Sequence, residues 1–366
     1  MGKYAKYVND LRLWTEIIRP SYRGKIADFS LVFDQKVFPE TKIWVEIFHV
    51  YAPGSGVHIP GELPVIIEGK EMEADGGGQH AHPKFDELFL FLGTNPYDNL
   101  VLGGEVEFWL GEGEEAQKFI AKTPTAEWVP RNLAHNPHYF SKVDSRDRPI
   151  LMMAMAMTSE YSLNPDSIRM TTLPPAFSFD KVGQEQKNKE LYTKYVNELK
   201  FATDRLFPWQ RGKAAVPTLM FDKNIYPETA LWVEIFHVYA GGTGVGIPTF
   251  EPIILPGREM TGGMRAEATK GGGHAHDFDE LFLFFGTDPH DTLNLGGEVE
   301  IWLGEGDEAE KFVTTKATGV WIPGGVVHNP TYFRRVDRPI MWVVTALTSE
   351  YAGNMRGASL PPGFKL

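Results

Sequence analysis

Residues 271–280 read Gly-Gly-Gly-His-Ala-His-Asp-Phe-Asp-Glu, and this stretch decides both the expected fold and the candidate site. Successive side chains of an extended strand point to opposite faces, so residues two apart share a face. His274, His276 and Glu280 have the same parity and would project to one side of such a strand. Asp279 is a rival carboxylate, and the parity favours Glu280. Two imidazoles and a carboxylate on one face are a set of potential metal ligands.

The N-terminal half carries a second version of this stretch. Residues 76–87 read Gly-Gly-Gly-Gln-His-Ala-His-Pro-Lys-Phe-Asp-Glu. His80 and His82 correspond to the two imidazoles and Glu87 to the carboxylate, in preference to the aspartate just before it. One extra residue breaks the parity between His82 and Glu87. We expect a bulge or loop at Pro83, because proline lacks the N–H that a strand ladder needs.

The whole chain is two copies of one unit. Residues Trp44–Ala52, with the sequence Trp-Val-Glu-Ile-Phe-His-Val-Tyr-Ala, recur without change as Trp232–Ala240. Self-similarity over such a length indicates a tandem arrangement of two similar structures. A polar stretch between the copies predicts an N-terminal domain of residues 1–183 and a C-terminal domain of residues 184–366.

The histidines follow the same repeat. Eight of the eleven form four pairs: His49 with His237, His80 with His274, His82 with His276, and His135 with His328. A neighbouring strand would bring the fourth histidine of each half beside the first motif. The sequence therefore predicts two metal sites, His80, His82, Glu87 and His135 in one half and His274, His276, Glu280 and His328 in the other. Three neutral imidazoles and one carboxylate suit Mn, Fe, Co, Ni, Cu or Zn, and on an octahedral ion they leave two positions for substrate or water.

These segments resemble the two sequence motifs of the cupin family. The first motif is His-x-His, then a glutamate, then a later glycine, which is Gly286 here and Gly93 in the other copy. The second motif, Pro-x-Gly-x-x-His, is matched through Gly325 and His328, while Asn132 replaces its glycine in the N-terminal copy. The resemblance covers both halves and implies a bicupin. Such a protein has two β-barrels, up to one divalent metal ion in each, and commonly forms a homo-oligomer.

Short apolar runs separated by Gly, Pro, Asn and Asp predict many short antiparallel strands. The expected fold class is all-β, with two tandem cupin-type β-barrels of the jelly-roll or double-stranded β-helix kind. We also expect a short helix before each barrel. In residues 190–206, Leu191, Tyr195, Leu199 and Leu206 have close to helical spacing.

Three polar residues occur only in the N-terminal copy and are candidate catalytic groups. His58, Arg131 and His138 stand where the C-terminal copy has Gly246, Gly324 and Thr331. We expect them to supply proton-transfer and anion-binding groups to the N-terminal cavity; the alternative is drift in loops. Tyr139 and Tyr332 closely follow the fourth ligands and are expected to line the cavities.

His49 and His237 lie on predicted strands, with a parity opposite to Glu46 and Glu234. One residue of each pair must then face the less apolar side of its strand. We expect each histidine to form a polar pair with a residue of a neighbouring strand, at a barrel rim or at the edge of a dimer. The alternative is that it contacts the substrate or a metal ligand.

The composition narrows the function classes. Among 366 residues, 36 Lys and Arg stand against 48 Asp and Glu, and the net charge of -12 argues against a nucleic-acid partner. The lack of cysteine excludes disulfides, thiolate nucleophiles and Cys-type metal sites. No apolar run approaches roughly 18 residues, and the first residues do not read as a secretory signal. We therefore expect a cytoplasmic protein that acts on a small molecule and not at a membrane.

The predicted function is a metal-dependent enzyme that cleaves a carbon–carbon bond in a small hydroxylated or diketo ring compound. A dioxygenase reaction is the favoured route. A hydrolase that opens a cyclic β-diketone with activated water fits the same ligands, and His58 or His138 would then be the general base. A sugar or keto isomerase and a non-catalytic binding or storage bicupin are further alternatives.

Overall fold

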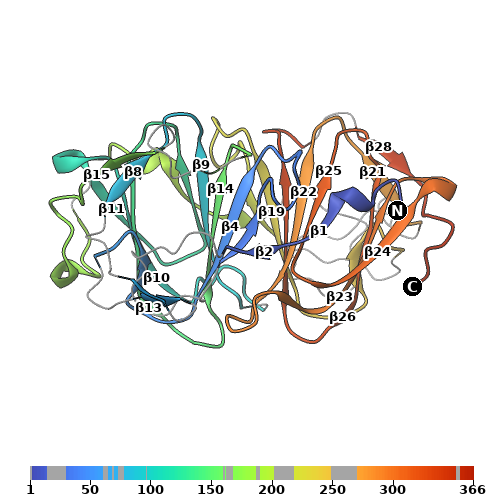
Figure 1. Cartoon of the computed structure of the whole chain (residues 1–366), viewed down its shortest axis with the longest axis horizontal. Helices are drawn as coiled ribbons and strands as arrows, with labels where there is room; N and C mark the ends of the chain where they lie inside the picture. Colours follow the sequence, from blue (N-terminus) through green and yellow to red (C-terminus); the bar gives the residue numbers. More distant parts are fainter. Residues whose placement is uncertain are drawn as a thin grey trace.

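Two antiparallel sheets, one of seven strands and one of six, build each half of the protein. The halves form two β-barrels that lie side by side in this computed structural model (Figure 1). The structure describes residues 2–14, 30–60, 65–67, 70–72, 78–95, 97–159, 161, 168–186, 190–201, 218–248, 270–351 and 355–366.

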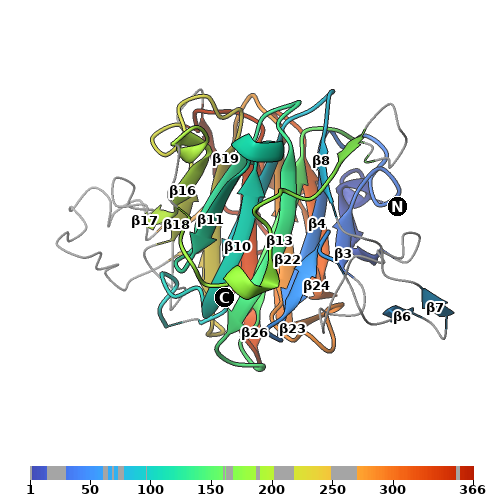
Figure 2. The same ribbon diagram turned by 90° about the vertical axis from the view of Figure 1, so that its left-hand side faces the viewer.

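The N-terminal barrel consists mainly of strands from the first half of the chain. Its seven-stranded sheet has the order β16 (Val196–Glu198), β12 (Thr125–Val129), β9 (Glu87–Leu92), β14 (Ile150–Ala156), β4 (Trp44–Val50), β3 (Leu31–Phe33) and β2 (Arg12–Leu13). Its six-stranded sheet has the order β11 (Gln117–Ala121), β10 (Gly104–Leu110), β13 (His135–Val143), β8 (Gln79–Ala81) and β15 (Arg169–Thr171), with β5 (Ser55–Val57) also paired to β13. A separate hairpin of β6 (Val65–Ile67) and β7 (Lys70–Met72) projects from the barrel (Figure 2).

The C-terminal barrel repeats this plan. Its seven-stranded sheet has the order β1 (Val8–Asp10), β25 (Thr318–Ile322), β22 (Glu280–Gly286), β27 (Ile340–Ala346), β19 (Trp232–Val238), β18 (Leu219–Phe221) and β17 (Lys200–Phe201). Its six-stranded sheet has the order β24 (Glu310–Lys316), β23 (Asn294–Leu303), β26 (His328–Val336), β21 (Gly273–Ala275) and β28 (Arg356–Ala358), with β20 (Thr243–Val245) also paired to β26.

The all-β prediction is confirmed, but the prediction of a short helix before each barrel is wrong. In the described part of the chain, helical structure is limited to five 3-10 turns of three residues each: Ala5–Tyr7, Gly113–Glu115, Phe179–Lys181, Thr193–Tyr195 and Gly306–Glu308. No helix among the described residues is long and apolar enough to cross a membrane.

Strand pairing explains why the helix prediction failed. The 3-10 turn at Thr193–Tyr195 leads directly into β16, whose Val196 lies opposite Glu127 of β12. Residues 202–206 of the predicted helix lie outside the described residues. The apolar spacing of Tyr195 and Leu199 reflects packing into a core. A short window of sequence cannot reveal a strand partner in a distant segment.

Each barrel takes its outermost strand from the other half of the chain. β1 pairs with β25 of the C-terminal barrel, with Val8 opposite Val320. In the same way, β16 pairs with β12 of the N-terminal barrel. The chain crosses between the barrels at Leu11 and at Leu199, and each of these side chains is only 3% exposed. The two halves are therefore tied together by backbone pairing as well as by packing.

Three apolar cores result from this arrangement, one inside each barrel and one between the barrels. The strand β4 contributes to two of them. Trp44 and Phe48 face the interior of the N-terminal barrel. Val45 and Ile47 pack in the core shared by both barrels. Because both faces of the seven-stranded sheets are covered, these strands are apolar almost throughout and do not alternate between buried and exposed residues.

His49 and His237 lie in the core between the barrels, and not beside the metal-ligand candidates. The Nε2 atom of His49 donates to the carbonyl of Gly286 at 2.8 Å, and that of His237 donates to the carbonyl of Gly93 at 2.9 Å. Burial lowers the pKa of each imidazole to about 4, and the carbonyl contact opposes that shift only in part. Both rings are therefore neutral at pH 7. Each one donates a hydrogen bond to a backbone carbonyl of the other barrel.

This arrangement predicts an acid-sensitive interface. The unfolded chain binds protons at these histidines below about pH 6.5, whereas the folded chain resists protonation down to about pH 4. The free energy of unfolding should thus fall as the pH drops through this window, by about 2 kcal/mol per histidine at pH 5. Urea denaturation at pH 7 and pH 5 measures the loss.

The variant His49→Gln/His237→Gln should lose much of this pH dependence, although it is less stable at pH 7. His290→Gln, which changes an exposed histidine, is the control and should leave the pH dependence unchanged. An unaltered dependence in the double variant would show that protonation elsewhere in the protein dominates.

Candidate metal centres

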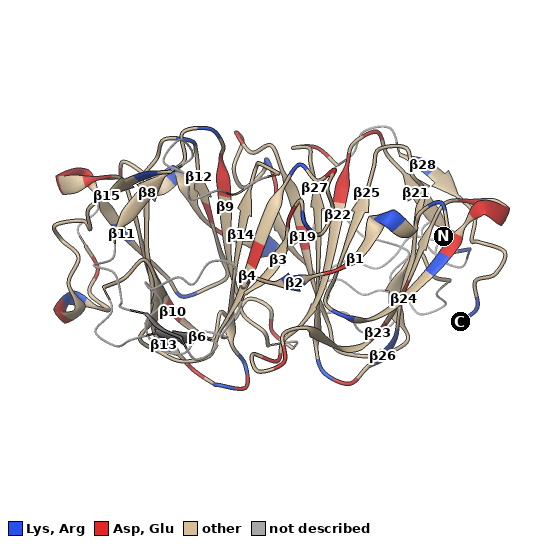
Figure 3. Cartoon of the chain, viewed as in Figure 1, with Lys and Arg blue, Asp and Glu red and all other residues tan. Residues whose placement is uncertain are grey.

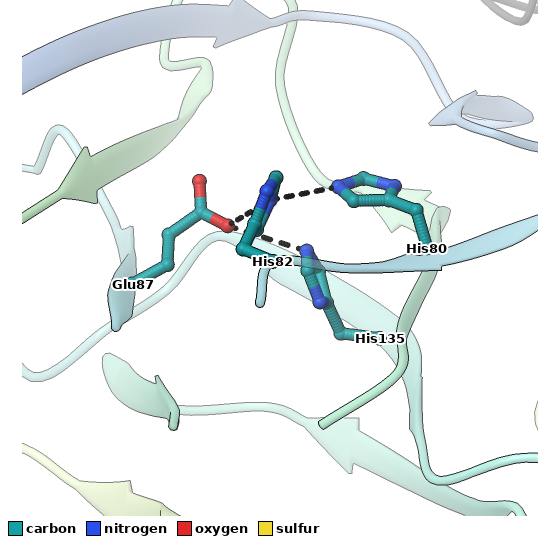
Figure 4. Close-up of side chains that lie close together, drawn as sticks. All are labelled: His80, His82, Glu87 and His135. Atoms are coloured by element: carbon teal, nitrogen blue, oxygen red, sulfur yellow. Dashed lines mark hydrogen bonds and ion pairs between the residues drawn. The ribbon is translucent and has the colours of Figure 1, made fainter. Parts of the chain in front are cut away.

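Four side chains converge inside the N-terminal barrel (Figure 4). His80 lies on β8 opposite His135, the first residue of β13, while Glu87 begins β9 and His82 follows β8. The Nε2 atoms of His80 and His82 are 3.1 Å apart. The Oε2 atom of Glu87 is 3.2 Å from Nε2 of His82 and 3.2 Å from Nε2 of His135. All four side chains are buried.

This cluster fits a divalent metal ion. Ligand atoms at roughly 2.0–2.2 Å from one ion lie about 3 Å from each other, which matches the observed separations. Within the part of the chain that the structure describes, Oε2 of Glu87 and Nε2 of His135 have no hydrogen-bond partner. Buried polar atoms without a partner are costly, and an ion among them would satisfy both.

The electrostatics of Glu87 suit a ligand. Burial by itself would raise the pKa of this carboxyl group. The neighbouring His82 and His135 lower it by more, so the pKa of Glu87 lies well below its usual value. The residue is therefore a carboxylate at neutral pH, as metal binding requires.

The C-terminal barrel contains the equivalent set with one difference. The Oε2 atom of Glu280 is 3.0 Å from Nε2 of His276 and 3.2 Å from Nε2 of His328. The Nε2 atom of His274 instead lies 3.0 Å from the hydroxyl of Tyr351. The three imidazoles lie close together, whereas Glu280 contacts only two of them and lies farther from His274. Burial lowers the pKa of His274 to about 3, so its ring is neutral and able to bind metal.

Short loops, and not the parity of one continuous strand, bring the glutamates to the histidines. β8 ends at Ala81 and β21 ends at Ala275, so short loops carry the chain to Glu87 and to Glu280. The extra residue at Pro83 is accommodated in such a loop. The two rival aspartates instead bind backbone N–H groups of the turn that precedes the fourth ligand. Asp86 accepts from the N–H of Arg131 at 2.8 Å, and Asp279 accepts from the N–H of Gly324 at 3.0 Å.

The turn before the fourth ligand is the same in both barrels despite its different sequence. Asn132 has φ 69° where the other barrel has Gly325 with φ 85°. The N–H of Asn132 donates to the carbonyl of His82 at 2.8 Å, and that of Gly325 to the carbonyl of His276 at 2.7 Å. Asparagine tolerates the left-handed backbone conformation better than most residues, so replacing the motif's glycine preserves the turn.

The three candidate catalytic residues lie in different environments. The ring of His58 lies 4.8 Å from that of His80, and His58 adopts φ 58° where Gly246 has φ 73° in the other barrel. A bulky residue held in this strained conformation is a common sign of a functional site. Arg131 points outward, with a 61% exposed side chain that pairs with Asp86. It does not join the ligand cluster.

His138 is fully buried in the N-terminal barrel and pairs with Glu127, which the sequence analysis did not identify. Their Nε2 and Oε2 atoms are 2.7 Å apart, and both side chains are 0% exposed. Phe89 lies against His138 and also against the ligand His135. In the C-terminal barrel, Val320 and Thr331 occupy the equivalent positions. The only signal in the sequence was the difference between the two copies at residue 127.

Two tyrosines near the ligands were also missed. The hydroxyl of Tyr161 is 3.5 Å from Nε2 of His82, which makes Tyr161 the counterpart of Tyr351. Both end a repeated Thr-Ser-Glu-Tyr sequence, which could have marked them. Tyr139 and Tyr332, which were expected to line the cavities, instead pack against chain segments that follow the barrels. Their ring partners are Phe179 and Phe364, respectively.

Comparison with known proteins establishes the fold. No family model matches the chain, and no curated protein matches it by sequence. Among solved structures, oxalate decarboxylase from Bacillus subtilis at pH 4.6 is similar with a TM-score of 0.53 and 11% identity, over 95% of this chain and 78% of that one. A second structure, which describes substrate binding and a reaction specificity switch in oxalate decarboxylase, is similar with a TM-score of 0.52 and 11% identity. The match covers 95% of this chain and 79% of that one. Oxalate decarboxylase is a bicupin, and this chain has the same two-barrel fold.

The Glu127–His138 pair predicts a specific pattern of stabilities. Glu127→Val alone leaves His138 buried beside an apolar side chain and should lower the free energy of unfolding by about 2–3 kcal/mol. The double variant Glu127→Val/His138→Thr installs the residues of the other barrel and should unfold within about 1 kcal/mol of the wild type. Denaturant titration measures both, and a double variant as unstable as the sum of its single changes would contradict the pairing.

Proposed function

We propose that this bicupin is a metal-dependent enzyme that cleaves a carbon–carbon bond in a small hydroxylated or dicarbonyl compound. The observation that carries this proposal is the convergence of His80, His82, Glu87 and His135, with buried ligand atoms that have no hydrogen-bond partner among the described residues. A divalent ion held there would polarise substrate oxygen atoms as a Lewis acid and, if redox-active, exchange electrons.

A cavity beside these ligands supports a catalytic role for the N-terminal barrel. His80 and Glu87 line it together with His58, Glu46 and Tyr161. The free space is about 10 Å³, which is room for one water-sized group. A substrate therefore reaches the ligands only if a lining side chain moves.

Met152 lines the same cavity and is the lining residue best suited to move, since an unbranched thioether changes rotamer easily. In the C-terminal barrel, the equivalent position holds Trp342. Its ring stacks on Phe236 at 4.5 Å and on Phe284 at 5.6 Å. In the C-terminal barrel, a pocket of about 830 Å³ reaches His274 but, among its described lining residues, none of the other three ligands. We assign substrate turnover to the N-terminal barrel, whose cavity reaches both His80 and Glu87.

The chain's own residues provide the rest of the chemistry. His58 is the imidazole beside His80 that can accept or release a proton at the cavity. The hydroxyl of Tyr161 lies where it can orient a substrate oxygen, and its ring is fixed by stacking on Trp44 at 4.3 Å. Phe89 is one of the apolar side chains that line the cavity, and excluding water there would strengthen electrostatic interactions.

Oxidative cleavage by a dioxygenase reaction is our primary assignment. Hydrolysis of a cyclic β-diketone is the second candidate. The observation that favours it is that three side chains able to transfer protons line the same cavity: His58, Glu46 and Tyr161. The two reactions differ in their need for oxygen and in the source of the oxygen atoms in the product.

Changing one ligand in each barrel tests the assignment to the N-terminal barrel. His80→Ala should lower kcat/KM by about 100-fold or more, because the ion at the cavity is lost. His274→Ala should keep kcat/KM within about threefold of the wild type while lowering the melting temperature. Elemental analysis of both variants verifies which ion is lost. Equal loss of turnover from the two changes would contradict the assignment.

Removing oxygen separates the two reactions. For a dioxygenase, turnover should stop under anaerobic conditions, and both atoms of isotope-labelled oxygen should enter the product. Mass spectrometry of the product measures the incorporation. Unchanged anaerobic turnover with label taken up from water would replace the oxidative assignment with the hydrolytic one. Chelation of the metal should abolish either reaction, and readdition should restore it.

A further inference from the structure

The six-stranded sheet of the C-terminal barrel faces away from the N-terminal barrel, and β24 forms one edge of it (Figure 1). The strand pairs with β23, and no other strand among the described residues pairs with it. Lys311, Val313 and Thr315 are exposed, whereas Phe312 packs against the core of the barrel. Val313 is 51% exposed although its side chain is apolar. An exposed edge of seven residues is a ready template for another strand.

The equivalent edge of the N-terminal barrel is covered by the chain itself. Its strand β11 pairs with β10 in the register that β24 has with β23, so Lys118 corresponds to Lys311. The backbone N–H of Lys118 donates to the side chain of Gln186 at 3.0 Å, and its ammonium group donates to the carbonyl of Lys181 at 3.0 Å. Lys118 is only 7% exposed as a result.

This comparison shows which backbone groups of β24 point away from the sheet. Because the N–H of Lys118 points outward, the same direction holds for Lys311 and for every second residue after it, Val313 and Thr315. Within the part of the chain that the structure describes, the N–H groups of these three residues have no hydrogen-bond partner. They form a row of donors and acceptors with the spacing that an antiparallel strand requires.

The sequence of β24 is complementary to itself in the antiparallel direction. When Val313 lies opposite Val313 of a second copy, Lys311 lies opposite Thr315. Glu310 then lies opposite Lys316, and both of these pairs occur twice because of the symmetry. Lysine on a strand edge usually discourages pairing, but in this register no two like charges face each other. The outward groups would form about six backbone hydrogen bonds between the copies.

The charged residues at the two ends of β24 can make this contact without giving up their own partners. Figure 3 shows both acidic and basic segments near the label of β24. The ammonium group of Lys316 pairs with Asp10 at 2.8 Å, yet its side chain is 66% exposed. Glu310 accepts from the backbone N–H of Lys3. An ammonium group has three donors and a carboxylate about four acceptor sites, so each group can also bind its counterpart on a second copy.

We propose that the protein forms a two-fold symmetric dimer in which β24 pairs antiparallel with β24 of a second copy. The two outer sheets then join into one continuous sheet across the interface. Backbone hydrogen bonds supply affinity, while the side chains of alternate residues set the register. The interface contains none of the metal-ligand candidates, so this inference does not depend on the proposed function.

Sedimentation velocity of the full-length protein over a range of concentrations tests the proposal. We expect a dimer that dissociates on dilution. Val313→Lys places like charges on the symmetry axis and should weaken dimerisation by at least about tenfold. Val101→Lys makes the same change at an exposed valine of the N-terminal half and should leave dimerisation within about twofold. The melting temperature verifies that each variant is folded. A monomer at every concentration, or an oligomer that Val313→Lys leaves unchanged, would overturn the proposal.

Charge reversal tests the register. Glu310→Lys alone places like charges opposite each other and should weaken the dimer by about tenfold. The double variant Glu310→Lys/Lys316→Glu restores opposite charges and should dimerise within about threefold of the wild type. If the double variant is no better than the single one, the strands do not meet in this register and the proposal fails.

Amide hydrogen exchange of the unaltered protein gives a measurement that needs no variant. The outward N–H groups of β24 should exchange more slowly as the concentration rises and the dimer forms. A peptide covering β15, an edge strand of the N-terminal barrel, is the control and should exchange at a constant rate. Exchange in β24 that stays the same at all concentrations would contradict the pairing.

Discussion

The seven-stranded sheets are buried on both faces, and this constraint organises the rest of the structure. One face lines a barrel and the other packs against the neighbouring barrel. A polar side chain on these strands has no access to bulk water, so it needs a partner within the protein. Three of them have one: Glu46 has Ser30, Glu127 has His138, and His49 has a backbone carbonyl of the other barrel. Oε2 of Glu87 has no hydrogen-bond partner among the described residues, and this is where we expect a metal ion.

The sequence was informative where the relevant signal was local and repeated. The eight metal-ligand candidates could be predicted because two short motifs occur twice at matching positions, and the structure brings the side chains of each set together. The choice of Glu87 over Asp86 agrees with the geometry, although short loops and not strand parity bring the glutamate to the histidines. Asn132 differs from the motif's glycine and yet keeps the turn, because its backbone reaches the same conformation.

Features that depend on distant pairing could not be predicted. The segment after residue 190 has helical spacing in its apolar residues but forms a strand on the other barrel. The sequence led to no prediction for Glu127, and its role follows only from His138, whose Nε2 atom lies 2.7 Å from it. His49 was expected at a rim or dimer edge, whereas it lies between two barrels of one chain. In each case the deciding partner lies on another strand, 11 residues away for Glu127 and 237 residues away for His49.

The exchange of outer strands has a consequence for how the protein is made. The N-terminal barrel is complete only after Val196–Glu198 has been synthesised, since β16 closes its sheet. The first strand of the chain must wait far longer, because its partner Val320 is about 310 residues downstream of Val8. At roughly 5–20 residues per second, translation takes about 15–60 s to cover that distance. During this time β1 has no sheet to join, and the C-terminal barrel can be completed only after Thr318–Ile322 has left the ribosome.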